Sequence, residues 1–79
     1  MNRYFDFTQT VVLVGKRIRT RIGWSGVPVG TTGTVVRADN TYTEGGRFAL
    51  VIRWDLPTRI KPLEDWFDAI EFQHLEVLP

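Results

Sequence analysis

Three arginines at alternate positions are the residues of this chain best suited to chemistry. Arg17, Arg19 and Arg21, here called the arginine row, alternate with Ile18 and Thr20. Side chains two residues apart on a strand lie about 7 Å from each other, close to the spacing of successive phosphates along one strand of nucleic acid. The row therefore suits phosphates or an acidic protein surface. It equally suits a solvated strand face whose arginines pair with acids on a neighbouring strand.

Two aromatic residues in predicted loops extend this candidate surface. Trp24 lies in residues 23–30, a segment rich in glycine with one proline, and Tyr42 lies in a polar turn. Exposed tryptophans favour binding surfaces because they contribute heavily to interface energies. The alternative is that Trp24 folds back over the end of the strands. The predicted partner-binding residues are Arg17, Arg19, Arg21, Trp24 and Tyr42. A nucleic-acid interface would use Lys16, Arg17, Arg19, Arg21 and Arg37, with the Trp24 indole stacked on a base.

A second charged group lies near the C-terminus. Asp65, Asp68 and Glu71 are spaced three apart, so a helix would bring their carboxylates to one side. They lack the glycine and the close ligand spacing of a dedicated calcium loop, and we predict no metal site. We expect a solvated acidic face on a short helix, or a counterpart to the arginine row within one molecule or between two.

Catalytic residues are scarce. His74 is the only histidine and Ser25 the only serine, cysteine is absent, and neither residue belongs to a recognisable nucleophile motif. Gly30 and Gly33 do not form a phosphate-binding loop, because no Lys-Ser or Lys-Thr pair follows them. We therefore expect no enzymatic activity and no cofactor.

The elements that would position these residues are mainly short strands. Strict alternation predicts a strand over residues 16–22, with Ile18, Thr20 and Ile22 on its buried face. Further strands are predicted over 34–38, 47–55 and 75–78, with 47–55 as the central and most buried one. A strand over 59–63 is placed at an edge because Pro62 interrupts it.

The remaining segments are assigned more coarsely. Residues 1–9 form a lead-in whose aromatic side chains can dock on the body, and 10–14 is a short extended segment. Residues 39–46 connect two strands as a hairpin. Residues 65–72 form one or two helical turns with Asp65 as N-cap. Trp54 and Trp66 are assigned to core or rim packing.

About five short strands, polar loops and one helical turn before the last strand predict a small all-β fold. The chain resembles the SH3-like barrels, and we expect a single partly open barrel over residues 1–79. Residues 15–19 with Gly30 and Gly33–Val36 are similar to KOW-type segments of ribosomal and transcription-factor proteins. With residues 51–55 and 72–75 added, the pattern is also similar to the E-type accessory protein of photosystem I and related electron-transfer accessory proteins.

The most extensive resemblance is to small bacterial proteins of unassigned function. It rests on Gly-Val-Pro-x-Gly-Thr-x-Gly at residues 26–33 and Trp-Asp-Leu-Pro at residues 54–57. SH3-like barrels serve many unrelated tasks, so the resemblance implies an architecture and no particular activity.

Composition narrows the functional classes. The chain has 79 residues, which suffice for one core, and its 43% hydrophobic content indicates a folded domain. No leader or membrane-spanning pattern is present, so we expect a cytoplasmic protein that does not enter a membrane. The net charge is only +1, yet residues 1–37 carry six basic residues and one acidic residue, whereas 38–79 carry four basic and eight acidic residues. Antiparallel folding would interleave these halves.

These observations favour a non-catalytic binding module, with another protein as its partner. The alternative is a KOW-like RNA- or DNA-binding protein that uses the arginine row. A third interpretation is an accessory component that docks on a larger complex through residues 65–72. An exposed strand edge would also permit a homodimer.

Overall fold

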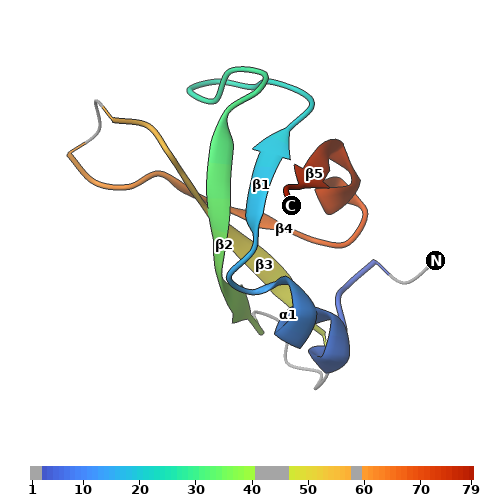
Figure 1. The fold of residues 1–79 in the computed structure, drawn as a ribbon. Coiled ribbons are helices and arrows are strands. Elements are labelled where there is room, and N and C mark those ends of the chain that lie inside the picture. The colour runs from blue at the N-terminus through green and yellow to red at the C-terminus, as the bar shows by residue number, and fades with distance from the viewer. Residues whose placement is uncertain (1–2, 41–46, 58–59) are drawn as a thin grey trace.

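The fold is a curved antiparallel sheet with one short helix beside it (Figure 1). The computed structural model of the protein describes residues 3–40, 47–57 and 60–79. In chain order the elements are α1 (Phe7–Leu13), β1 (Arg17–Thr20), β2 (Thr32–Asp39), β3 (Ala49–Trp54), β4 (Glu64–Phe67), the 3-10 helix η1 (Glu71–His74) and β5 (Leu75–Val77). None of the helices in these ranges has the length and apolar character needed to cross a bilayer.

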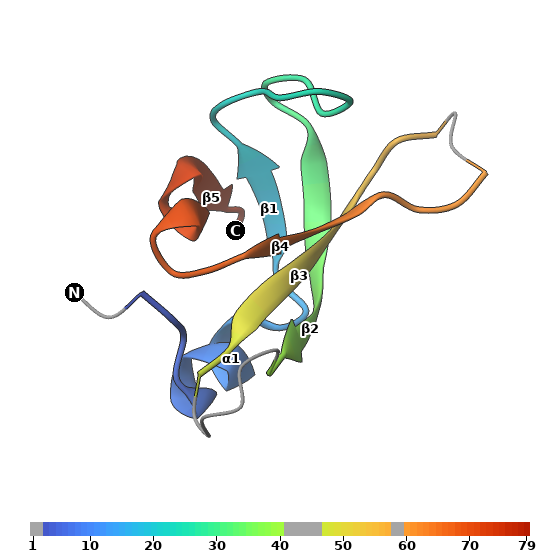
Figure 2. The same cartoon turned by 180° about the vertical axis from the view of Figure 1, so that it is seen from behind.

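The five strands are ordered β4-β3-β2-β1-β5, and all neighbours are antiparallel. The predicted all-β class and the 3-10 turn before the last strand are confirmed. The sheet is open and does not close into a barrel, since the described parts of β4 and β5 do not pair with each other. Seen from behind, η1 and β5 lie together next to β1, at the edge of the sheet that β5 forms (Figure 2). The predicted strand 47–55 is the most buried, as β3, but the middle position in the sheet belongs to β2.

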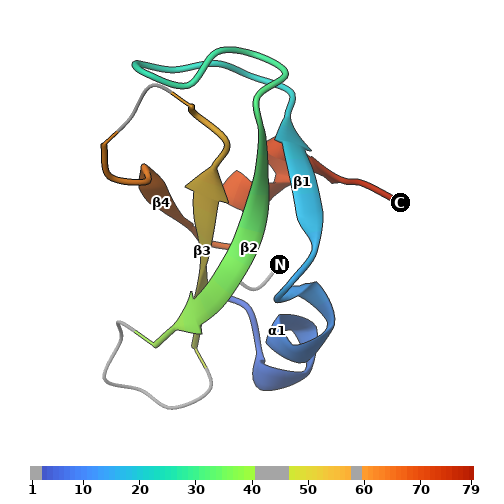
Figure 3. The same ribbon diagram turned by 60° about the vertical axis from the view of Figure 1, so that its left-hand side comes forward.

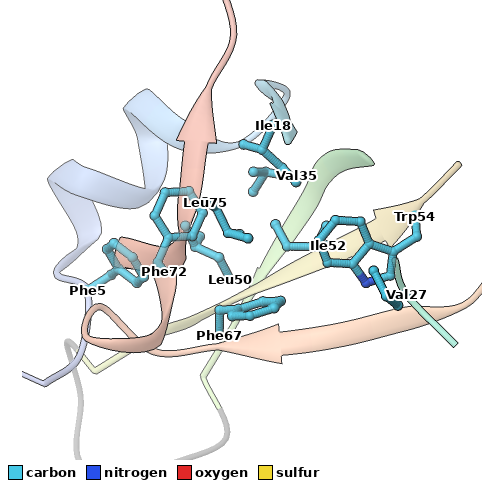
Figure 4. Close-up of a cluster of buried hydrophobic side chains, with 10 residues drawn as sticks. All are labelled: Phe5, Ile18, Val27, Val35, Leu50, Ile52, Trp54, Phe67, Phe72 and Leu75. Atoms are coloured by element: carbon cyan, nitrogen blue, oxygen red, sulfur yellow. The ribbon is translucent and has the colours of Figure 1, made fainter. Parts of the chain in front are cut away.

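The core lies on the concave side of the sheet and is closed by residues from both ends of the chain (Figure 4). Alternation places Ile18 of β1, Val35 of β2 and Ile52 of β3 in this core. Phe5 packs edge-on against Phe72 of η1, with ring centroids 5.5 Å apart. The predicted docking of the N-terminal lead-in is therefore confirmed for Phe5.

The prediction of an extended segment over 10–14 is wrong, because helix α1 covers most of it. The Asp6 carboxylate accepts a hydrogen bond from the Gln9 amide at 2.8 Å, and the Gln9 side chain accepts one from the Asp6 amide at 2.9 Å. This capping box satisfies two amides at the helix start and outweighs the β-branched valines that favour a strand. The helix turns Phe7, Val11 and Val12 towards solvent.

The predicted helix over 65–72 is also wrong in its first half. Residues 64–67 form β4, and only 71–74 form a helical turn. Asp65 is therefore not an N-cap: its carboxylate accepts a hydrogen bond from the Trp54 indole nitrogen at 2.8 Å. Asp68 stabilises the start of the helical turn instead, because its carboxylate accepts a hydrogen bond from the Glu71 amide at 2.8 Å.

The predicted strand over 59–63 is not found either, since residues 60–63 run as bends and coil before β4. Pro62 cannot donate to a ladder, and the chain pairs with β3 only beyond it. The predicted hairpin over 39–46 lies largely outside the described residues.

Glycine is needed for different reasons at position 30, just before β2, and at position 33, near the start of β2. Gly30 has φ +87°, a left-handed conformation that other residues adopt at a cost, and it ends the loop before β2. Gly33 lies within the strand, directly opposite Trp54 of β3. A β-carbon at position 33 would lie 2.7 Å from the Arg53 carbonyl oxygen, so glycine allows β2 to approach β3 closely at this point. Figure 3 shows β2 and β3 as neighbouring strands.

Candidate partner-binding surfaces

The structure places the first two arginines of the row on the convex face of the sheet. Ile18 and Thr20 are buried, and Arg17 and Arg19 point the other way. Arg17 forms a two-pronged ion pair with Asp55 and also donates to the Thr34 hydroxyl at 2.8 Å. The pKa of the Asp55 carboxyl lies below its ordinary value, mainly through the bond from Arg17 and then through that from the Thr32 hydroxyl.

The other two members of the row also have acceptors within the molecule. Arg19 pairs with Glu76 of β5 at 3.3 Å. Arg21 lies beyond the end of β1, and its guanidinium donates to the carbonyl oxygens of Gln73 at 3.0 Å and Leu75 at 3.3 Å. The row is thus not one continuous strand face, because β1 ends at Thr20 and Ile22 is 42% exposed.

The two basic residues added for nucleic acid behave differently from each other. Lys16 is exposed and forms no ion pair with any residue in the described ranges. Arg37 pairs with Glu64 at 3.1 Å and lies over the Trp66 ring, 5.9 Å from its centre. Glu64 also pairs with Arg53 at 2.9 Å, and together the two guanidinium groups lower the pKa of the Glu64 carboxyl. Sequence reasoning missed this cluster because it depends on the register of three strands.

Trp24 lies over one end of the core, in the partly buried position that the alternative interpretation predicts. Its ring meets those of Trp54 and Phe67 edge-on, with centroids 5.4 Å and 5.8 Å apart. The peptide groups of Trp24 and Val27 bond to each other, which makes the tight turn that holds the indole there. Tyr42, the second aromatic residue of the predicted set, lies outside the described residues.

Beside Trp24 is an open hollow of about 410 Å³, which we call the Trp24 groove. It lies where the loop after β1, strand β4 and helix η1 meet. Its lining combines aromatic, aliphatic and acidic residues: Ile22, Trp24, Asp65, Trp66, Phe67, Glu71 and His74. The only signals for it in the sequence are the loop tryptophan and the acidic residues, which lie some 40 positions away along the chain.

The three acidic residues that the sequence placed on one helix face are arranged differently from the prediction, and two of them line the groove. Asp65 lies in β4, Asp68 precedes η1 and Glu71 begins it, so the three do not share a helix face. Asp68 turns inward and pairs with Arg3 at 2.8 Å. Asp65 and Glu71 accept hydrogen bonds from uncharged groups, the Trp54 indole and the Asp68 amide. Neither forms an ion pair within the described ranges, but Arg3, which pairs with Asp68, also attracts the Glu71 carboxylate.

Within the described part of the chain, no three histidine, cysteine or acidic residues are grouped as metal ligands. His74 lies at the groove, exposed and without a nucleophile among the described residues that line it.

Comparison with known proteins leaves the family open. No family model matches the chain, and no curated protein or solved structure matches it. The resemblances to KOW-type segments, to the photosystem I accessory protein and to small bacterial proteins therefore stay predictions.

Proposed function

We propose that this protein is a non-catalytic module that binds a segment of another protein at the Trp24 groove. The observation that carries the proposal is the groove itself, an open hollow of about 410 Å³ with aromatic and aliphatic walls and two carboxylates that pair with no cation among the described residues. Apolar concave surfaces with a few polar groups are the usual form of binding sites. The five antiparallel strands and the 3-10 turn support an SH3-like architecture, which presents loops to partners.

The groove is well placed for recognition because two of its aromatic side chains pack against the core. Trp24 and Phe67 are both anchored against Trp54, which is 3% exposed and part of the core. A partner that contacts Trp24 or Phe67 therefore meets a ring that already packs against Trp54, which limits the conformational entropy lost at these two side chains on binding. Tyr42 stays a proposed contact.

The arginine row supports a nucleic-acid partner less well. Phosphates would have to displace Asp55 from Arg17 and Glu76 from Arg19, and Arg21 already donates to two carbonyl oxygens. This competition reduces the gain from each phosphate contact, although the exposed pairs are individually weak. Titration of labelled RNA and DNA at low and at moderate salt tests this alternative: tight, strongly salt-dependent binding would favour it over the groove.

The groove is tested by selecting peptides from a random twelve-residue display library on the immobilised protein. We expect selected peptides to lose at least tenfold in affinity on Ile22→Arg, which fills the groove from an exposed position. Val29→Arg is the matched control, because Val29 is 68% exposed and does not line the groove. Thermal unfolding checks that both variants fold. Peptides that bind both variants equally, or a selection without enrichment, would contradict the proposal.

A further inference from the structure

Strand β4 forms one edge of the sheet, and its free side borders the Trp24 groove. The Trp54 amide bonds to the Leu63 carbonyl oxygen at 3.0 Å, which identifies Trp54 and Leu63 as a hydrogen-bonded pair. Bonded and non-bonded pairs alternate along an antiparallel ladder, so Asp65 and Phe67 also bond to β3. The peptide groups of Glu64 and Trp66 consequently face away from β3. Neither has a backbone partner elsewhere among the described residues.

The position of Trp66 supports this geometry. Side chains alternate along a strand, so the Trp66 side chain lies on the face opposite Phe67. Its indole donates to Asp39 at 2.8 Å and lies under Arg37, which belongs to the convex face. Trp66 nevertheless lines the groove, and we assign this contact to its main chain. The groove thus combines edge peptide groups of β4 with carboxylates and aromatic rings.

We infer that the partner adds to the free edge of β4 as an extended strand and places a lysine or arginine side chain in the Trp24 groove. This inference rests on the proposed function and names the class of its partner. Exposed strand edges recruit extended peptides through main-chain hydrogen bonds, and neighbouring pockets read the alternate side chains.

Charge selects a basic side chain for this position. Asp65 and Glu71 line the groove and form no ion pair among the described residues, although Arg3 also attracts Glu71. Trp24 and Phe67 line the groove too, and aromatic rings can attract a cation. A neutral or acidic side chain would leave Asp65 uncompensated and Glu71 with the attraction of Arg3 alone. A lysine or arginine would meet both the carboxylates and the rings, while its aliphatic stem covers Ile22.

The same charges argue against a second copy of this chain as the occupant. The β4 strand of a second copy has the sequence Glu-Asp-Trp-Phe, which offers no lysine or arginine to place beside Asp65 and Glu71. The chain's own basic strand, β1, is not accessible to a second copy because it already pairs with β2 and β5.

The test uses two synthetic peptides, acetyl-Thr-Val-Arg-Val-Thr-amide and the same peptide with citrulline in place of arginine. Citrulline keeps the shape and most hydrogen bonds of arginine but has no charge. In ¹H–¹⁵N NMR titrations of the whole chain, the arginine peptide should shift the amides of 64–68 and the Trp24 indole. We expect it to bind about tenfold more tightly than the citrulline peptide, as one charge next to carboxylates and rings predicts.

Protein variants identify the charges involved. Asp65→Asn and Glu71→Gln keep the acceptor oxygens that bond to Trp54 and Asp68 but remove the charges, so each should lower the affinity for the arginine peptide several-fold. Glu76→Gln is the matched control, because it removes the same charge from β5, where Glu76 pairs with Arg19. Methylating the peptide nitrogens one at a time should weaken binding at alternate positions only, which is the pattern of an added strand.

The outcomes separate the inference from the proposed function. Equal binding of the two peptides at the groove would overturn recognition of a cation and leave the binding module standing. Methylation effects without alternation would overturn strand addition. If library peptides bind at the groove but the arginine peptide shifts none of 64–68, the inference fails alone. If neither binds there, the proposed function fails with it.

Discussion

Replacement of Gly33 by alanine tests the central packing of the sheet, on which the floor of the groove depends. The new β-carbon would lie 2.7 Å from the Arg53 carbonyl oxygen and 3.1 Å from side-chain atoms of Ile52 and Trp54. Side chains can turn away, but the carbonyl oxygen belongs to β3 and moves only with its strand. We expect Gly33→Ala to push β2 and β3 apart next to Trp54, the residue on which Trp24 rests.

The cost follows from the contact distances. Overpacking a filled interior costs about 1–3 kcal/mol, and a clash with main chain belongs at the upper end, so we expect about 2–3 kcal/mol. A domain of 79 residues has a total stability of roughly 4–12 kcal/mol. At about 4–8 °C per kcal/mol, the midpoint of thermal unfolding should fall by roughly 10–20 °C. Circular dichroism during heating and urea titration followed by tryptophan fluorescence measure the two quantities.

Gly30 is the matched control, because a side chain there is disfavoured by the backbone conformation and not by a steric clash. A β-carbon there meets nothing within 4 Å, but φ is +87°. Gly30→Ala should cost about 1–2 kcal/mol, and Gly30→Asn less, because asparagine tolerates the left-handed region. At position 33 asparagine should be at least as destabilising as alanine. A Gly33→Ala variant within about 0.5 kcal/mol of the parent protein would refute the steric explanation, since changes that small are usual at neutral surface sites.

Three further predictions concern the contacts around this core. Trp24→Ala should lower the free energy of unfolding by about 1–3 kcal/mol through loss of two edge-on ring contacts, and Trp24→Phe should lose less; denaturant titration compares them. Asp55→Asn removes a carboxyl whose pKa is lowered by Arg17. The stability it contributes is present above the unfolded pKa and lost as pH falls through the folded one. The variant should therefore be up to about 0.5 kcal/mol less stable at pH 7, and this difference should disappear as the pH falls through the folded pKa; the effect is small because the pair is exposed. Asp6→Ala should destabilise by about 1 kcal/mol and Asp6→Asn by much less, as a helix cap predicts; amide exchange of residues 7–13 would separate this from a global change.

Local alternation predicted the parts of the fold whose side chains divide cleanly between two faces. In β1 the order Arg-Ile-Arg-Thr places Ile18 in the core, and in β3 the nearly continuous apolar run marks a strand buried on both faces. Helix α1 was missed because its valines favour strands, although Asp6 and Gln9 have the spacing of a capping box. The helical spacing of Asp65, Asp68 and Glu71 was misleading, because tertiary contacts with Trp54 and β3 determine the backbone there.

The candidate site was predictable only in part, because its residues come from distant parts of the chain. Trp24 is recognisable from its residue type and its glycine-rich loop. The carboxylates opposite it depend on how β4 pairs with β3 and on where η1 begins, and neither follows from local sequence. The acceptors of the arginine row also depend on strand pairing that local sequence does not determine. Asp55 lies next to Arg17 only because β2 and β3 pair in this particular register.

The pairing of charges explains why the acidic side of the molecule is the better candidate for recognition. Arginines of residues 1–37 pair with acids of residues 38–79 in four places within the described ranges, as Arg3–Asp68, Arg17–Asp55, Arg19–Glu76 and Arg37–Glu64. Antiparallel folding thus brings the basic part of the sequence against the acidic part, and their charges offset each other within one molecule. Asp65 and Glu71 are left out of this pairing among the described residues, and both line the groove. An external cation there has no ion pair of the described residues to break, although Arg3 also attracts Glu71, whereas a phosphate at the arginine row competes with a carboxylate already in place. The electrostatic selectivity of the protein should therefore be for basic partners, although the largest charge cluster in its sequence is basic.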